Sequence, residues 1–169
     1  REAAVTLERM WAGWRAEYLA TPAFGRTDLG CVLCRLVAAE DDAAALVLER
    51  TELTITVMNL YPYGSGHLMV SPRRHVAGFL ECTAEEFRAV GDAQLRALRA
   101  VTAAYGPEGV NVGANLGRAA GAGVPDHLHV HVVPRWNGDT NFMTSLVETR
   151  VLPESLAVGY ERLRAVWPR

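Results

Sequence analysis

Residues 127–133 read His-Leu-His-Val-His-Val-Val, a run in which histidine alternates with aliphatic residues. Successive side chains of a β-strand point to opposite faces of the sheet. The three histidines therefore share one face, while Leu128, Val130 and Val132 enter the core behind them. An imidazole beside apolar packing must be hydrogen-bonded, metal-bound or protonated. Three such rings in alternation predict a functional site, whereas a single histidine is usually a satisfied core residue.

The segments around this run predict an antiparallel sheet. Each is a short stretch of β-forming residues, and turn-forming residues such as those of Pro62–Gly66 separate them. The expected strands cover residues 46–49, 53–59, 67–71, 110–115 and 128–133.

Three helices are expected beside the sheet. Thr83 and Glu86 have the spacing of a capping box, and the apolar pattern continues at helical spacing to about Ala104. Amphipathic patterns predict an N-terminal helix over about 5–19 and a C-terminal helix over about 153–166. We therefore expect an α+β fold with a five-stranded antiparallel sheet, a long helix and flanking N- and C-terminal helices.

Composition narrows the function classes. The 169 residues, half of them hydrophobic, suffice for one sizeable core, so we expect a single domain over 1–169. The net charge of -2 argues against a nucleic-acid partner. All 17 basic residues are arginines, which excludes a phosphate-loop lysine and a Schiff-base lysine. The chain shows neither a bilayer-length apolar run nor a secretory leader, so we expect no membrane partner and a cytoplasmic location.

A second group of residues has the donor types of a metal site. Cys31 and Cys34 form a Cys-x-x-Cys pair, and His75 and His127 supply two imidazoles. Two thiolates and two imidazoles make the closed tetrahedral set that structural zinc prefers. Metal-free thiols and a redox pair are the alternatives, although the sequence context of a thioredoxin-like motif is missing. From the residues alone zinc, free thiols and a redox pair all stay open, and no organic cofactor is expected.

A glycine-rich loop precedes the histidine run. Asn115 is followed by Gly117, Gly121 and Gly123. Glycines let main-chain amides approach phosphate oxygens closely, and the Asn115 amide can donate to the same group. A glycine-rich turn is common in itself, but its position beside the histidines favours a phosphate site.

These residues together resemble the histidine-triad superfamily. The resemblance covers the core from about 31 to 142 and includes residues 59–75 as well as the histidine run and the Val-Pro-Arg that ends it. Residues 59–63 and 131–142 look most like the bacterial branch related to diadenosine tetraphosphate phosphorylases.

The resemblance implies roles for the site residues. In this family the middle histidine, here His129, attacks the α-phosphorus, and His131 lies on the leaving-group side. Asn115 and the main chain around Gly123 and Val124 would hold the phosphate, and Asn59 would lie near the ribose. Zinc-binding relatives use residues that match Cys31, Cys34, His75 and His127, so the resemblance makes structural zinc the expected cofactor. The family also implies a homodimer or a larger assembly such as a tetramer. Many relatives have serine or threonine near Gly123 or Val124, so the final acceptor, water or phosphate, stays open.

The expected activity is cleavage of a dinucleoside polyphosphate, such as diadenosine tetraphosphate, through a nucleotidyl-histidine intermediate. Alternatives are an enzyme that cleaves nucleoside phosphoramidates or adenylyl sulfate, and a module that binds AMP with little turnover. A hydrolase that holds one metal ion with all three histidines is a further alternative, although three residues of one strand wrap poorly around a tetrahedral ion.

Overall fold

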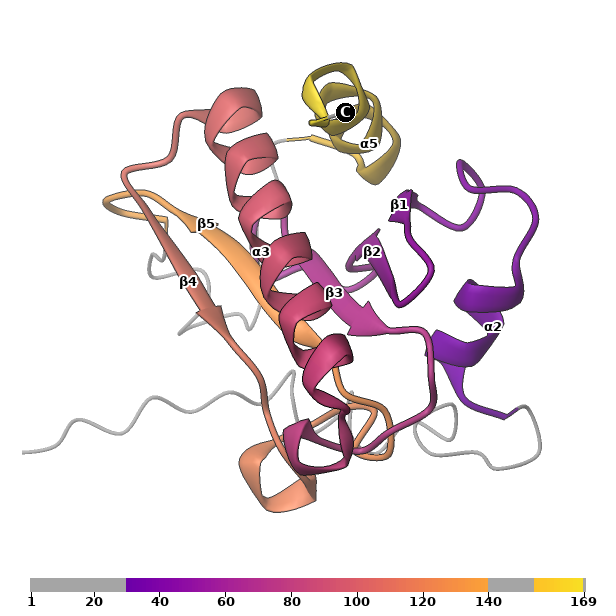
Figure 1. Ribbon diagram of the computed structural model, residues 1–169. Coiled ribbons are helices and arrows are strands. Elements are labelled where there is room, and N and C mark those ends of the chain that lie inside the picture. Colours follow the sequence, from indigo (N-terminus) through magenta and orange to yellow (C-terminus); the bar gives the residue numbers. More distant parts are fainter. Residues whose placement is uncertain (1–29, 140–153, 169) are drawn as a thin grey trace, which may run out of the picture.

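A computed structural model describes residues 30–139 and 154–168 of the chain. Within these residues five strands form one antiparallel sheet with the order β1-β2-β3-β5-β4 (Figure 1). The strands are β1 (Val47–Arg50), β2 (Thr54–Met58), β3 (Leu68–Pro72), β4 (Gly109–Gly113) and β5 (Val130–Arg135). The expected five-stranded antiparallel sheet of an α+β fold is confirmed.

The described helices are α2 (Val32–Ala38), α3 (Ala84–Tyr105) and α5 (Leu156–Val166), and short 3-10 turns are η2 (Phe79–Glu81) and η3 (Arg118–Ala120). The long and the C-terminal helix were expected, and the capping box is present: Thr83 Oγ1 accepts from the Glu86 amide at 3.1 Å, and the Glu86 carboxylate accepts from the Thr83 amide at 2.8 Å. The helix expected over 5–19 lies outside the described residues. Among the described helices, none has both the length and the apolar character needed to cross a bilayer.

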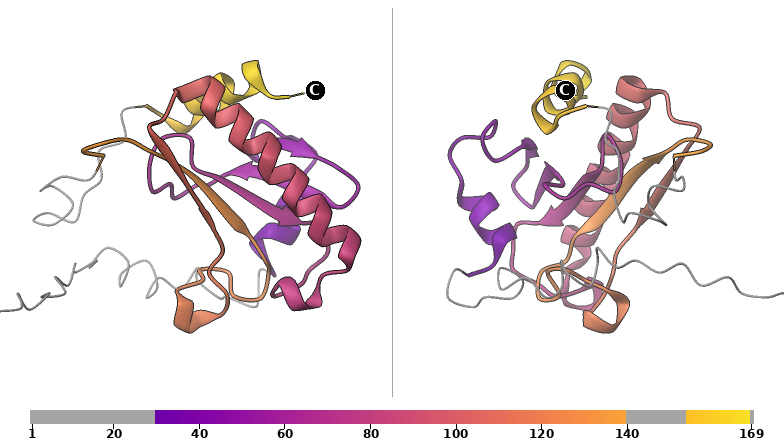
Figure 2. Two further views of the ribbon diagram at one scale, coloured as in Figure 1. Left: turned by 60° about the vertical axis from the view of Figure 1, so that its left-hand side comes forward. Right: turned by 180° about the vertical axis from the view of Figure 1, so that it is seen from behind.

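The sheet carries helices on both faces (Figure 2). Helix α3 packs on one face, where Val130 and Val132 of β5 join the main core, and α5 packs against the end of α3 and against β1. On the opposite face Ile55 and Val57 of β2 contact the apolar side of α2. Because side chains alternate along β5, this opposite face also receives His131.

The strand expected over 128–133 begins later, at Val130, and continues to Arg135. The amide of Leu128 donates to the Val76 carbonyl, and the carbonyl of His127 accepts from the ring of His129. Because the Leu128 N–H and the His127 carbonyl bond elsewhere, they cannot pair with a neighbouring strand, and the strand begins after them. The other expected strands are displaced by one or two residues at their ends.

Helix α2 was not among the helices expected from the sequence. The helix has only seven residues, too few for an amphipathic repeat to show. Arg50 of β1 explains how so short a helix is held. Its guanidinium donates to three carbonyl oxygens at the end of α2, those of Leu36, Val37 and Ala39.

Candidate functional site

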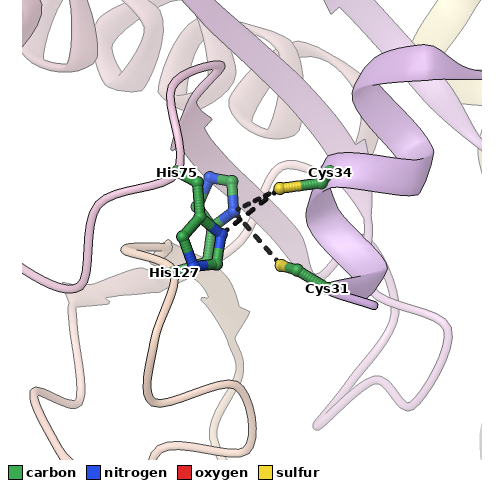
Figure 3. A group of neighbouring side chains, drawn as sticks. All are labelled: Cys31, Cys34, His75 and His127. Atoms are coloured by element: carbon green, nitrogen blue, oxygen red, sulfur yellow. Dashed lines mark hydrogen bonds between the residues drawn. The ribbon is translucent and has the colours of Figure 1, made fainter. Parts of the chain in front are cut away.

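The four expected metal ligands come together from three separate segments (Figure 3). Cys31 is the N-cap of α2 and Cys34 lies in its first turn, while His75 follows β3 and His127 precedes β5. Their ligand atoms all lie within 4.8 Å of one another. The Nδ1 atom of His127 is 3.3 Å from the Cys31 sulfur and 3.5 Å from the Cys34 sulfur, and Nδ1 of His75 is 3.3 Å from Cys34.

The hydrogen bonding of His127 leaves one of its ring nitrogens able to bind a metal. Its Nε2 lies 2.9 Å from the carbonyl oxygen of Pro72 and must donate to it, because a carbonyl only accepts. The neutral ring therefore has an unprotonated Nδ1, which faces both sulfurs. A histidine that donates one nitrogen to a carbonyl and offers the other is typical of a zinc ligand. Two sulfurs and two nitrogens are a donor set that structural zinc prefers.

His129 is buried, with 5% of its surface exposed. Its Nδ1 lies 2.8 Å from the carbonyl oxygen of His127, so this nitrogen carries a proton and donates. Burial lowers the pKa of His129 below its ordinary value, which keeps the ring neutral at pH 7. The remaining nitrogen, Nε2, then has a free electron pair. This is the protonation state that a nucleophilic imidazole needs.

His131 forms a pair with a fourth histidine, His67. Nε2 of His67 is 2.9 Å from Nδ1 of His131. The amide of Tyr63 donates to Nδ1 of His67 at 3.0 Å, so the neutral His67 ring carries its proton on Nε2 and donates it to His131. A neutral His131 must then be protonated on its own Nε2. The pair thus presents an N–H group beside His129, whose ring centroid is 5.1 Å from that of His131.

Sequence reasoning missed the role of His67 and Tyr63. His67 was expected only as the first residue of a strand, but it precedes β3 and is fully buried. The ring of Tyr63 packs on both His67 and His131, with centroid distances of 4.6 and 5.6 Å. One signal was available: the chain has five histidines, and a histidine after the turn at Pro62–Gly66 was the only one without an assigned role.

Asn59 lies beside this histidine pair and is buried. Its Oδ1 accepts from the Tyr61 amide at 3.0 Å, and its Nδ2 is 3.4 Å from Nδ1 of His67. Both ends of the side-chain amide are thus engaged within the loop. The structure brings Asn59 to the site, and its expected contact with a ribose stays a prediction.

The glycine-rich loop connects β4 to β5. Gly121 has a φ of +83° and closes η3, with its amide donating to the Arg118 carbonyl. In the described part of the chain the amides of Gly123 and Val124 have no main-chain acceptor, and the side chain of half-buried Asn115 has no hydrogen bond. Gly123, Val124 and Asn115 therefore have hydrogen-bond donors that can contact a phosphate. The Gly121 amide already donates within the turn.

Open space adjoins His131 on the sheet. Gly113 of β4 is directly opposite His131 in the antiparallel ladder, and residues opposite each other present side chains on the same face. Among residues 30–139 and 154–168, a Cβ atom built on Gly113 meets nothing within 4 Å. A ligand at His131 therefore finds room over β4.

A shallow depression of about 560 Å³ lies elsewhere, between the turn before β1 and α5. Four carboxylates and one arginine contribute to its lining: Glu40, Asp41, Asp42, Glu161 and Arg164. An acidic surface repels a polyphosphate, so this depression does not compete with the histidines as a nucleotide site.

Comparison with known proteins agrees with this geometry. Residues 40–138 match the HIT domain family. The chain belongs to the HIT family. This HIT protein is thereby a nucleotide-binding hydrolase or transferase. It is 38% identical over 167 residues to an AP-4-A phosphorylase of Mycobacterium tuberculosis, covering 96% of this chain and 86% of the relative.

Two further relatives bear on the site. The HIT protein is 31% identical over 134 residues to adenosine 5'-monophosphoramidase hnt1 of Schizosaccharomyces pombe, covering 79% of this chain and 96% of the relative. A solved structure of a zinc-bound histidine triad family protein from Mycobacterium smegmatis is 27% identical and superimposes with a TM-score of 0.66, covering 82% of this chain and 93% of that chain.

Proposed function

We propose that this HIT enzyme cleaves dinucleoside polyphosphates such as diadenosine tetraphosphate, with His129 as the nucleophile. The observation that carries the proposal is the hydrogen bond from Nδ1 of His129 to the His127 carbonyl. It fixes a neutral ring with its unprotonated Nε2 beside the N–H group of His131. A nucleophile and a proton donor thus stand side by side.

In the first step Nε2 of His129 attacks the α-phosphorus. A P–N bond forms, the P–O bond to the leaving polyphosphate breaks, and its electron pair stays on the bridging oxygen. Nε2–H of His131 donates to that oxygen. The leaving group from diadenosine tetraphosphate is ATP, and AMP stays on His129.

The loop before β5 supports this step. The amides of Gly123 and Val124 and the side chain of Asn115 are the donors proposed to hold the phosphoryl oxygens. Preorganised donors of this kind are each worth about 3 to 4 kcal/mol of transition-state stabilisation. The loop therefore matters almost as much as the nucleophile.

In the second step an acceptor oxygen attacks the same phosphorus and the P–N bond breaks. Phosphate as acceptor gives ADP, and water gives AMP. The similarity to an AP-4-A phosphorylase over nearly the whole chain favours phosphate. Incubation with diadenosine tetraphosphate in the presence and absence of phosphate tests this directly: we expect ATP plus ADP with phosphate, whereas ATP plus AMP in both samples would show hydrolysis.

The His129→Ala variant tests the nucleophile. We expect it to fold and to bind AMP but to lose turnover and covalent labelling by an α-³²P nucleotide. Turnover at the wild-type rate in this variant would exclude the assignment.

A second candidate activity is cleavage of nucleoside phosphoramidates. The Nε2–H group of His131, which the hydrogen bond from His67 sets up, favours this activity. An amine leaves from phosphorus only after it gains a proton. The similarity to hnt1 supports the same chemistry. The ratio of rates on adenosine 5'-phosphoramidate and on diadenosine tetraphosphate decides which substrate is preferred.

We further propose one structural zinc per chain, bound by Cys31, Cys34, His75 and His127. Bound zinc would supply a fixed tetrahedral link between the three segments and would not contact the reacting groups. Because the set needs reduced thiols, a reducing compartment such as the cytoplasm fits it. Zinc content of the purified protein, measured by mass spectrometry, checks the proposal.

The protein is also proposed to form a homo-oligomer, a dimer or tetramer. Strand β4 is an edge of the sheet, and Val112 on it is 45% exposed. An exposed edge strand with an apolar residue is suited to pairing with a second copy. Light scattering after size-exclusion chromatography measures the assembly.

A further inference from the structure

One peptide group joins the metal set to the nucleophile. The peptide between His127 and Leu128 is planar, so its carbonyl and its N–H move together. The carbonyl accepts from Nδ1 of His129 at 2.8 Å, and the N–H donates to the Val76 carbonyl at 2.6 Å. The orientation of the His129 ring therefore depends on how this peptide plane is held.

Each support of the peptide leads to a metal-binding residue. His127 belongs to the peptide itself, and its ring faces the sulfurs of Cys31 and Cys34. Val76, which accepts the Leu128 N–H, directly follows His75 in the chain. A metal that binds both His75 and His127 thus restricts movement of the peptide at two points, the residue that carries its carbonyl and the neighbour of the residue that accepts its N–H.

The far end of α2 is anchored independently of the cysteines. Arg50 donates to the carbonyls of Leu36, Val37 and Ala39 at 2.9, 2.9 and 3.0 Å, and to the Asp42 carboxylate at 2.6 Å. Because these contacts hold the C-terminal end of α2 on β1, loss of a metal frees the N-terminal turn and leaves the helix docked.

We propose that the set of Cys31, Cys34, His75 and His127 is a positioning device for His129: bound zinc fixes the peptide between residues 127 and 128 and so holds the nucleophilic ring in its Nδ1-protonated orientation. This inference rests on the proposed function of His129. It gives the metal a part in the reaction rate without any contact between the metal and the substrate. An error of about 1 Å in such an orientation costs on the order of 100-fold in rate.

Two variants of His75 provide the test. His75 is exposed, so His75→Ala removes a ligand without leaving a core cavity. His75→Cys is the matched control, because a third thiolate restores a four-ligand set for zinc. Cobalt(II) titration, followed by its visible absorption with thiolate ligands, reports which proteins hold the metal. Circular dichroism reports whether each is folded.

The main readout is the tautomer of His129, observed by long-range ¹H–¹⁵N NMR of the imidazole nitrogens. We expect a single Nδ1–H form in zinc-loaded wild type and in His75→Cys, and mixed tautomers in His75→Ala. A second readout is the single-turnover rate of nucleotidyl-His129 formation. It should fall 10- to 100-fold in His75→Ala and recover in His75→Cys, while the Kd for AMP changes less than threefold.

The opposite result overturns the inference: a folded, zinc-free His75→Ala protein with one tautomer and the wild-type rate shows that the metal is a fold support only. If His75→Ala does not fold, wild type stripped by a chelator and then reloaded replaces it, and unfolding there too also overturns the inference. If no sample forms nucleotidyl-His129, the proposed function has failed, whereas the tautomer comparison still decides the role of the metal set.

Discussion

Nε2 of His67 lies 2.9 Å from Nδ1 of His131, and this contact determines which nitrogen of His131 carries the proton. Because the Tyr63 amide occupies Nδ1 of His67, the direction of the hydrogen bond is fixed from His67 to His131. His131 is thereby set up as a donor on the side that His67 does not occupy. The catalytic contribution of His131 should depend on how much the leaving group needs that proton.

We expect His131→Ala to lower the rate on an alkyl phosphoramidate by about 10² to 10⁴, the usual contribution of a general acid. The loss should be much smaller on a nucleotide p-nitrophenyl ester, whose leaving group departs without a proton. Comparison of kcat/KM on the two substrates measures the difference. Equal losses on both would show that His131 acts in another way.

His67 should act through His131. The His67→Leu variant removes the donor and should show the same dependence on leaving group in weaker form. The His67→Gln variant keeps an N–H near the position of Nε2 and should recover part of the rate. If the two variants lose activity equally on both substrates, His67 serves only the packing of the core.

Gly113 tests where the substrate lies. A side chain at this position, opposite His131, meets no other part of the described chain, and valine suits a strand. We expect Gly113→Val to fold as wild type but to raise KM at least tenfold by occupying space that the nucleotide needs. Gly109→Val is the matched control, since it also points into open space but pairs with Arg135 at the far end of β4. A normal KM for Gly113→Val would place the substrate away from β4.

The sequence predicted the strands and the long helix because their signals are local. The capping box of Thr83 and Glu86 and the alternation around Val130 can be recognised within a few residues. The His67–His131 pair could not be predicted in this way, because it depends on the register that places Met69 opposite His131 across two strands distant in sequence. The start of β5 at Val130 was also hidden, since it follows from a hydrogen bond to Val76 in another loop.

The residues of the candidate metal set could be predicted from the sequence, whereas the contacts that hold those residues in place could not. Cysteine spacing and the histidines offer a possible four-ligand set, and the family resemblance favours that set over free thiols. The contacts that make the site a rigid part of the protein come from Arg50 and Pro72, which carry no metal-binding group and so leave no sequence signal. Side chains that hold ligands in place are visible only when the fold is known.

Gly66 keeps the turn before His67 in place. It has a φ of +72°, and a Cβ atom there lies 2.6 Å from the ring of Tyr105. We expect Gly66→Ala to destabilise the protein by about 1 to 3 kcal/mol through overpacking and backbone strain. Displacement of the turn should also lower kcat, because the turn carries Tyr63 and His67. Urea unfolding and kcat are the two measurements.

The neighbouring Gly64→Ala variant is the control for this prediction. The nearest atom to its Cβ is the Pro134 carbonyl oxygen at 3.9 Å, an ordinary contact. We expect its stability to lie within about 0.5 kcal/mol of wild type. If both variants behave alike, the close approach of Tyr105 does not constrain the turn.

Glu86 links the loop of His75 to the long helix and should make stability depend on pH. Arg74 donates to both oxygens of the Glu86 carboxylate at 2.7 Å. These bonds, with those from Thr83, lower the pKa of Glu86 from 4.5 to about 2. Because the pKa is lower in the folded state, the stabilisation is fully present above about pH 4.5 and is lost as the pH falls toward 2.

We expect Glu86→Gln to cost about 1 to 2 kcal/mol at pH 7, in the range of a charged hydrogen bond reduced by the exposure of Arg74. At pH 3 the free energies of unfolding of the variant and the wild type should differ much less, because most of the stabilisation by the charged Glu86 carboxylate is then lost. Urea unfolding at both pH values measures this. Glu85→Gln, in the same turn but exposed, removes only an interaction with the helix dipole. A pH dependence equal in the two variants would show that the Arg74 bonds contribute nothing specific.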